Sequence, residues 1–493
     1  MNTTTKLFLF LLVLGTGSSC RKQTPVQLNS DKEITGFKLE LTHNTGSIEK
    51  DIEGKITGNA IVLVLTKETD LTKLKATFVT SGKSVTVANV KQESMVTVND
   101  FSKPLNYQVT AEDGSQRTYT VTCEWKISVP HVYIQTANNT PVTSKDDYLQ
   151  ADIQITGSTA YPDYTGTTKI KGRGNSTWNL PKKPYRLKLD KKASILGLAE
   201  EKDWVLLANY IDPTLMCNAV AMKTGQLLQI PYTNHIIPVD VTINGTYMGS
   251  YSLTEQVAVS KNRVNIEDGG VLMELDVYFD EPWKFTSSNY NLPVMIKYPD
   301  LTSNDQLNLI KDDFQLMENT IFNNGFPNNN YTDHFDINAL VNYFIVYNLT
   351  GNEELNHPKS VYLYKPKNGK YTMGPLWDFD WAYGFEGSGT HFKTFDRPLF
   401  WNSSAIGTTF FTRLLSDPKV KTLYKQKWTA FKADKLPELL TYIDRYANTI
   451  ETSQKKDYDK WGNSSGNFSA DVLKMRNWIK NRATYIDQYV AGF

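Results

Sequence analysis

Two aspartates stand two positions apart in the segment Trp377–Trp381, which reads WDFDW. The segment ends a strand-like run, and residues i and i+2 of a strand face the same side about 6.6 Å apart. We therefore expect Asp378 and Asp380 to point together while Phe379 points into the core. Two convergent carboxylates among apolar neighbours are costly unless a proton or a cation lies between them, and a hard divalent metal with oxygen ligands suits them. An aspartate pair that merely caps a turn or a helix is the alternative that the spacing leaves open.

An acid and an amide precede this pair on a loop. Asn352 and Glu354 follow a helix-like segment that ends at Gly351 and stand before the hairpin that leads to WDFDW. Kinase-like phosphotransferases use this order: a loop carboxylate takes the proton of the acceptor hydroxyl, an amide supplies a metal ligand, and a later aspartate holds magnesium on the nucleotide phosphates. The order predicts Glu354 as the base and Asn352 as a metal ligand beside Asp378.

Cations gather nearer the N-terminus. The segment Lys171–Trp178 reads KGRGNSTW, a glycine-rich loop that can hold a phosphate through backbone amides and the charge of Arg173. The next segment, PKKPYRLKL at Pro181–Leu189, carries four basic residues in seven positions. This local excess favours an anionic ligand, although an edge strand that uses lysines to block aggregation would look the same.

Several lysines are candidates for contact with phosphate. Lys182, Lys183, Lys188 and Lys297 compete for this role, and Lys183 ranks first because flanking prolines fix the direction of the chain. Glu255, directly after a strand, would hold one of the lysines in place, or else it caps the element that follows.

The elements that must position these residues fall into two patterns. Short alternating strands from 34 to 126, with an Asp113-Gly114 turn, predict an all-β, immunoglobulin-like sandwich. From 130 to 493 longer strands mix with helices, and the period after Thr408 is almost wholly helical, which predicts an α+β domain with a helical C-terminal part. One of its helices is expected to start at Asp212-Pro213 and to run through Leu228.

The N-terminal segment and the composition limit where the protein is located and which partners it binds. Residues 1–19 read as a lipoprotein signal peptide with cleavage before Cys20, which would carry the lipid, and 20–33 read as a linker. Ordinary secretion with cleavage nearby is the alternative. The 53 basic and 52 acidic residues balance, so composition gives no reason to expect nucleic acid as a partner. We expect an exported protein on the bacterial outer membrane, on its periplasmic or surface face, that meets the membrane only through this lipid. Cys123 and Cys217 are expected as buried thiols, with a disulfide as the alternative.

Four motifs in order, KGRGNSTW, PKKPYRLKL, NRVNI and WDFDW-AYG, resemble the spore-coat protein H (CotH) kinase family, as does WVLLANYID at Trp204–Asp212. The front domain resembles β-sandwich modules of exported Bacteroidetes proteins. The family resemblance implies an atypical, bilobal protein-kinase-like fold that moves phosphate from ATP to protein serine or threonine with Mg²⁺. It implies Asp378 as the metal-binding aspartate with Asp380 in support, and Glu354 at the catalytic acid. The residues expected around the nucleotide are Arg173, Lys183, Lys188, Glu255, Lys297 and Trp377.

Two departures from the family pattern concern activity rather than fold. The catalytic position is often aspartate in the family, whereas this chain has Glu353 and Glu354, and the segment Met216–Asn218 lacks an arginine that many members carry. The alternative function is therefore a non-catalytic surface lipoprotein that binds protein or glycan. A glycosidase is a third reading, but two acids on one strand cannot flank a glycosidic bond from both sides.

Overall fold

The computed structural model describes residues 27–66, 69–158, 160–385 and 394–493, so the expected signal peptide and Cys20 lie outside the described residues. The chain forms two compact units, one with residues up to Val64 and Thr69–Glu124, the other with Leu65–Glu68 and Trp125–Phe493. Within the described ranges, none of the helices combines the length and the apolar character that crossing a bilayer requires.

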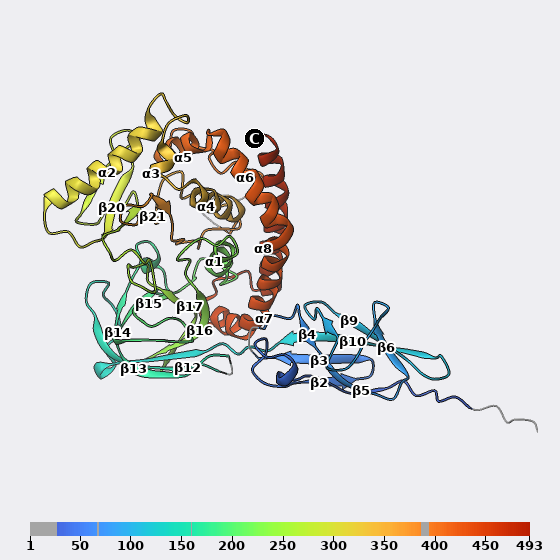
Figure 1. The fold of residues 1–493 in the computed structure, drawn as a ribbon. Helices are drawn as coiled ribbons and strands as arrows, with labels where there is room; N and C mark the ends of the chain where they lie inside the picture. The colour runs from blue at the N-terminus through green and yellow to red at the C-terminus, as the bar shows by residue number, and fades with distance from the viewer. Residues whose placement is uncertain (1–26, 67–68, 159, 386–393) are drawn as a thin grey trace, which may run out of the picture. The chain divides into compact units, whose positions relative to one another are not determined.

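The first unit is all-β (Figure 1). Its strands are β1 (Ile34–Leu39), β2 (Ile52–Thr57), β3 (Ala60–Leu65), β4 (Leu74–Lys75), β5 (Thr77–Thr80), β6 (Ser84–Val87), β7 (Val90–Lys91), β8 (Val98–Asn99), β9 (Leu105–Thr110) and β10 (Gln116–Trp125). Eight of them form a sheet in the order β5-β1-β2-β3-β10-β9-β6-β7, and β4 pairs with β8. The predicted hairpin is confirmed: Gln116 pairs with Thr110 across the turn, and Gly114 has a φ of 84° that suits glycine.

The second unit begins with a closed barrel (Figure 1). Its strands are β11 (His131–Thr136), β12 (Leu149–Thr156), β13 (Tyr164–Gly172), β14 (Tyr185–Ala193), β15 (Glu201–Leu207), β16 (Ile236–Ile243) and β17 (Thr246–Glu255), closed in the order β11-β12-β13-β14-β15-β17-β16. Alternate residues such as Val132, Ile153, Leu187 and Leu253 are fully buried and fill the interior.

The helix α1 (Cys217–Leu227) lies between β15 and β16 in the chain and starts later than its sequence predicts. The Asp212 carboxylate accepts hydrogen bonds from the backbone N–H of Thr214 at 2.8 Å and of Cys217 at 2.7 Å, which closes a turn before the helix. Leu215, with a φ of 58°, has a left-handed backbone that no α-helix can include. The expected start at Asp212-Pro213 was therefore wrong by one turn.

The remainder of the second unit is a five-stranded sheet covered by helices (Figure 1). Its strands are β18 (Val271–Leu275), β19 (Lys284–Thr286), β20 (Pro293–Tyr298), β21 (Val361–Lys365) and β22 (Thr372–Met373), in the order β19-β20-β18-β21-β22. Its helices are α2 (Asn304–Phe322), α3 (Tyr331–His334), α4 (Ile337–Thr350), α5 (Ile406–Leu415), α6 (Pro418–Ala430), α7 (Leu436–Trp461) and α8 (Phe468–Ala491). The α4 helix is buried along almost its whole length and packs against α1, α6 and α8.

Packing contacts join the barrel to this helical part. The α7 helix packs on β17, and a small apolar cluster joins Val205 and Leu207 of β15 to Tyr362, Tyr364 and Trp377. The predicted architecture is confirmed: an all-β front region precedes an α+β domain of two lobes with a helical C-terminal part.

Candidate functional site

A cavity of about 570 Å³ lies between the barrel and the helical part of the second unit. Six of the predicted site residues border it: Arg173, Lys297, Glu354, Trp377, Asp378 and Asp380. Such a volume is typical of a small-molecule site.

The glycine-rich loop leaves β13 at Gly172 and brings Arg173 to this cavity. A Cβ at Gly172 would lie 2.2 Å from the Trp178 ring, and Gly174 has a φ of 84°, so neither position tolerates another residue without a shift. The Arg173 guanidinium lies 5.3 Å from the centre of the Trp377 ring. Within the described parts of the chain it has no ion pair within 4.0 Å, so its donors are open to a ligand.

The aspartate pair reaches the cavity by a different backbone from the one its sequence predicts. Strand β22 ends at Met373, and Asp378 has a left-handed φ of 65°, so WDFDW is not a strand. Phe379 is fully buried as expected and packs on the Tyr347 ring at 5.0 Å. A bend in the backbone, held in place by the buried Phe379 side chain, therefore brings both aspartates to the cavity.

Asn218, at the start of α1, fixes this bend. Its carbonyl oxygen accepts the backbone N–H of Phe379 at 2.9 Å, and its amide donates to the Asp380 carboxylate. Asn218 lies in the segment where the sequence lacks the arginine of the family pattern, and no feature of its surroundings predicted a role.

The charges on these acids are poorly compensated. The Asp378 side chain is exposed toward the cavity, but the loss of surrounding water there raises its pKa, with the Arg173 charge acting against this. Burial and the Asp378 charge together raise the pKa of Asp380 to about 7. Burial and the Asp378 charge also raise the pKa of Glu354 well above its ordinary value, and its Oε2 has no hydrogen-bond partner. A cation or protons would reduce the repulsion among these three carboxylates.

The loop after α4 separates the two adjacent glutamates. Glu354 borders the cavity, whereas Glu353 is fully buried, accepts a hydrogen bond from the Trp401 indole at 2.9 Å and lies 3.5 Å from Arg397. This placement favours Glu354 over Glu353 as the acid that faces a ligand.

Asn352 supports the acids from behind. Its amide donates to the Asp378 carbonyl oxygen at 3.1 Å, and its own carbonyl oxygen accepts the N–H of Glu354 at 2.8 Å. Asn352 is buried and does not border the cavity, so in this structure it orients the two acids instead of facing a metal.

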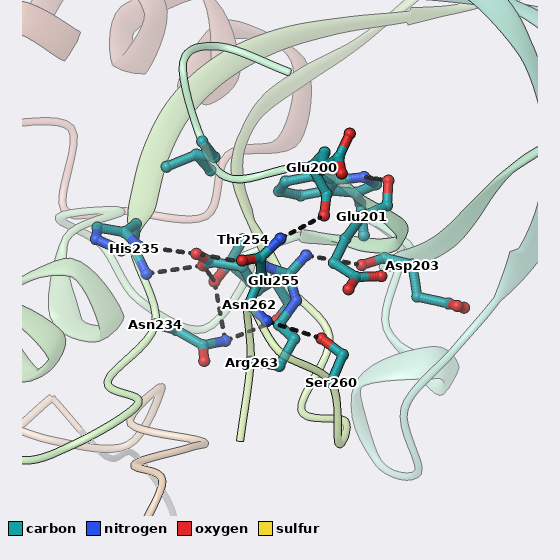
Figure 2. Close-up of polar contacts among 12 residues, drawn as sticks. Glu200, Glu201, Asp203, Asn234, His235, Thr254, Glu255, Ser260, Asn262 and Arg263 are labelled. Atoms are coloured by element: carbon teal, nitrogen blue, oxygen red, sulfur yellow. Dashed lines mark hydrogen bonds and ion pairs between the residues drawn. The ribbon is translucent and has the colours of Figure 1, made fainter. Parts of the chain in front are cut away.

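Three predicted residues lie away from the cavity. Lys183 donates to the Trp178 carbonyl oxygen at 2.7 Å and lies over that ring. Lys188 is exposed on β14. Glu255 borders a second, smaller cavity, where it contacts His235 (Figure 2). Lys297, in contrast, borders the main cavity and pairs with Glu274 at 3.1 Å and with Glu281.

Lys182 borders the main cavity but is already paired. Its ammonium donates to Asp457 at 2.6 Å and to the Ser250 carbonyl oxygen, and the side chain is fully buried. Sequence reasoning missed Asp276 and Lys359, which border the cavity. Asp276 follows β18 directly, and a carboxylate at a strand end was the one available signal.

The cavity has two walls of opposite charge. The barrel wall carries five cations and one acid: Lys145, Lys171, Arg173, Lys182, Arg186 and Asp146. The opposite wall carries seven acids and two lysines: Glu274, Asp276, Asp280, Glu281, Glu354, Asp378, Asp380, Lys297 and Lys359. A ligand that is anionic toward the barrel and carries a metal cation toward the acids would match both walls.

Within the described residues, no group of three or more His, Cys, Asp or Glu side chains is arranged to hold a metal ion. Cys217 is a buried thiol at the start of α1, and Cys123 is half-buried in β10 of the other unit.

Comparisons with known proteins give two family matches. The model described as "CotH kinase protein" matches residues 170–486, and the model described as "SGBP, N-terminal" matches residues 38–123. A solved structure from Bacteroides thetaiotaomicron, provisionally described as a glycoside hydrolase, matches at 14% identity with a TM-score of 0.16 over 59% of this chain and 89% of its own. No curated protein matches the chain.

Proposed function

Since the chain belongs to the CotH kinase protein family, we propose that it transfers a phosphoryl group from ATP, with Mg²⁺, to a serine or threonine of a protein acceptor. The observation that carries this proposal is the pairing of a cationic wall with a wall of under-compensated carboxylates around one cavity. Phosphates with a bound cation present the complementary pattern.

The acids fit a magnesium ion. Mg²⁺ is usually held by one or two carboxylates together with substrate phosphates, not by a cage of protein ligands. Asp378 and Asp380 would hold it, since both border the cavity and the loss of surrounding water raises the pKa of each. When bound, the metal neutralises charge on the phosphates.

The residues of the chain supply the remaining tasks. The guanidinium of Arg173 has unpaired donors, which can form two parallel hydrogen bonds to phosphate oxygens. Lys297 adds a positive charge held in place by Glu274. Glu354 would accept the proton of the acceptor hydroxyl. Because the pKa of Glu354 is raised, positive charge in the occupied cavity must first lower it so that the carboxylate is free.

We also propose that the protein is exported and held on the outer membrane through a lipid on Cys20. The match of residues 38–123 to the SGBP N-terminal model supports an association with the cell surface. The residues that would carry the lipid lie outside the described ones.

Nucleotide binding tests the proposal first. ATP with Mg²⁺ at millimolar concentration should raise the melting temperature of the full chain by several degrees, and Asp378→Ala should lose this shift. Asp268→Ala, an exposed acid outside the cavity, is the matched control and should keep it. A folded wild-type protein that shows no shift contradicts the proposal.

The base assignment needs a separate measurement. Glu354→Gln should abolish phosphate transfer, followed by mass spectrometry of acceptor proteins, while ATP still binds. An unchanged transfer rate would remove Glu354 from this role.

A second candidate is a non-catalytic surface protein that binds protein or glycan. The SGBP N-terminal match favours it, together with a glutamate where the family often has aspartate. One added methylene moves a base by about an ångström, a displacement that can cost on the order of 10²-fold in rate. A glycan-array signal that survives Asp378→Ala would support this candidate.

A further inference from the structure

A second cavity of about 290 Å³ lies beside the first, and Gln256 borders both. It is enclosed by the segment Tyr232–His235, the end of β17, the loop Lys261–Asn265 and Pro375. None of the phosphoryl-transfer chemistry proposed above uses it.

A charged group with fixed geometry occupies its wall (Figure 2). Glu255 accepts the backbone N–H of His235 at 2.8 Å, and its other oxygen lies 2.7 Å from the His235 Nδ1. The side chain of Glu255 is buried, and the Thr254 hydroxyl adds a contact at 3.4 Å. Both oxygens of this carboxylate are therefore engaged within the protein.

Arg263 is built into the same wall with part of its donor capacity unused. Its side chain is only 6% exposed, and its guanidinium stacks on the Trp204 ring at 4.7 Å. Nη2 donates to the Asp203 carbonyl oxygen at 3.4 Å. Nη1 has no hydrogen-bond partner and lies 3.7 Å from Glu255, which is too long for a hydrogen bond. A buried guanidinium nitrogen without an acceptor is costly.

Two further cationic groups border the cavity with free donors. Among the described residues, the Lys261 ammonium has no ion pair or hydrogen bond, and the Nε2 of His235 has no protein partner. The contact with Glu255 raises the pKa of His235, which favours its charged form. Three cations thus border a cavity whose one carboxylate is already engaged.

The volume limits the size of the ligand. At about 290 Å³ the second cavity is roughly half as large as the first, which favours a smaller ligand. The free donors of His235 and Lys261, beside the positive charge of Arg263, favour oxygen acceptors with negative charge.

We propose that this second cavity binds a small oxyanion, either a phosphate- or sulfate-type group or the carboxylate of a small acid. The site is separate from the nucleotide cavity and does not depend on the phosphotransferase proposal. Pro375 borders this cavity and lies two residues before Trp377. A ligand in the second cavity would therefore lie beside the segment that leads into the aspartate pair.

Equilibrium dialysis of the full chain with radiolabelled sulfate at fixed ionic strength tests the proposal. The Arg173→Gln variant, in which the first cavity loses its free guanidinium, should still bind about one sulfate per chain. Lys261→Gln should weaken binding severalfold, and combining it with His235→Asn should weaken it at least about tenfold, since charge-assisted hydrogen bonds are lost. Lys191→Gln, an exposed lysine of β14, is the matched control and should bind as the wild type does.

Competition then separates the two ligand chemistries. Displacement of labelled sulfate by inorganic phosphate and not by acetate or succinate assigns a phosphate-type site, and displacement by the carboxylates assigns a carboxylate site. The proposal is overturned if Arg173→Gln binds no sulfate, or if Lys261→Gln and Lys191→Gln bind it equally well. Loss of ATP binding in Asp378→Ala would leave all of these results unchanged.

Discussion

The two walls of the main cavity differ in how far their charges are paired within the protein. On the barrel wall Lys182 is paired with Asp457 at 2.6 Å and Arg186 with Asp203 at 2.8 Å. On the other wall Asp378, Asp380 and Glu354 have no ion pair within 4.0 Å among the described residues. These two cations stabilise the fold through their ion pairs, whereas the three acids carry charge that weakens the fold until a ligand binds, as functional sites often do.

Removing a charge from the barrel wall should give the largest effect. Lys182→Met leaves Asp457 buried without its cation, and breaking such a pair costs about 3–5 kcal/mol of unfolding free energy. Urea denaturation followed by circular dichroism measures this loss. Lys182→Met combined with Asp457→Leu removes both charges and should recover most of the stability, because α7 still packs on β17 and no buried charge is left unpaired. A single variant as stable as the wild type would show that this wall does not depend on its pairs.

Removing a charge from the acidic wall should have the opposite sign. Asp378→Asn relieves repulsion on Asp380 and Glu354, and because solvent screens the charge of this exposed side chain, the ligand-free protein should gain about 1 kcal/mol of unfolding free energy. The same variant should lose stabilisation by ATP with Mg²⁺. If it unfolds more easily than the wild type, Asp378 contributes to the fold and the contrast between the walls is wrong.

Lowering the pH should stabilise the folded protein through Asp380 of the acidic wall. The pKa of Asp380 is raised from 3.8 to about 7, so between these values the folded chain binds a proton that the unfolded chain lacks. The unfolding free energy attributable to this group therefore falls as the pH rises through the window, by roughly 1 kcal/mol per pH unit, and levels off above pH 7. The difference between wild type and Asp380→Asn, measured by urea denaturation from pH 5 to 8, isolates this part. A pH-independent difference would contradict the raised pKa.

Local patterns in the sequence predicted those parts of the fold that depend on neighbouring residues alone. The hairpin at Asp113-Gly114 and the helical C-terminal part agree with the prediction, because alternation and helical period directly reflect which side chains face the core. The site was predicted in part, since Asp378, Asp380, Glu354 and Arg173 do share a cavity.

Long-range contacts explain what the sequence did not predict. The bend at Asp378 depends on Asn218, which lies 160 positions earlier in the chain, and no local pattern marks such a partner. The sequence ranked Lys183 above Lys182, but the ion pair with Asp457 on α7 buries Lys182 beside the cavity. Lys183 was ranked first because of its flanking prolines, yet its ammonium donates to the Trp178 carbonyl oxygen and does not border the cavity.

The smallest effect should come from the lysine that the structure places outside both walls. Lys188 is exposed on β14, and surface substitutions of this kind change the unfolding free energy by less than about 0.5 kcal/mol. Lys188→Gln should therefore match the wild type in stability and in its affinity for ATP, measured by calorimetry with Mg²⁺. Lys297→Gln, which takes a cation from the cavity, should weaken ATP binding about tenfold or more. Equal losses in the two variants would mean that long-range charge, and not the placement of cations within the cavity, holds the nucleotide.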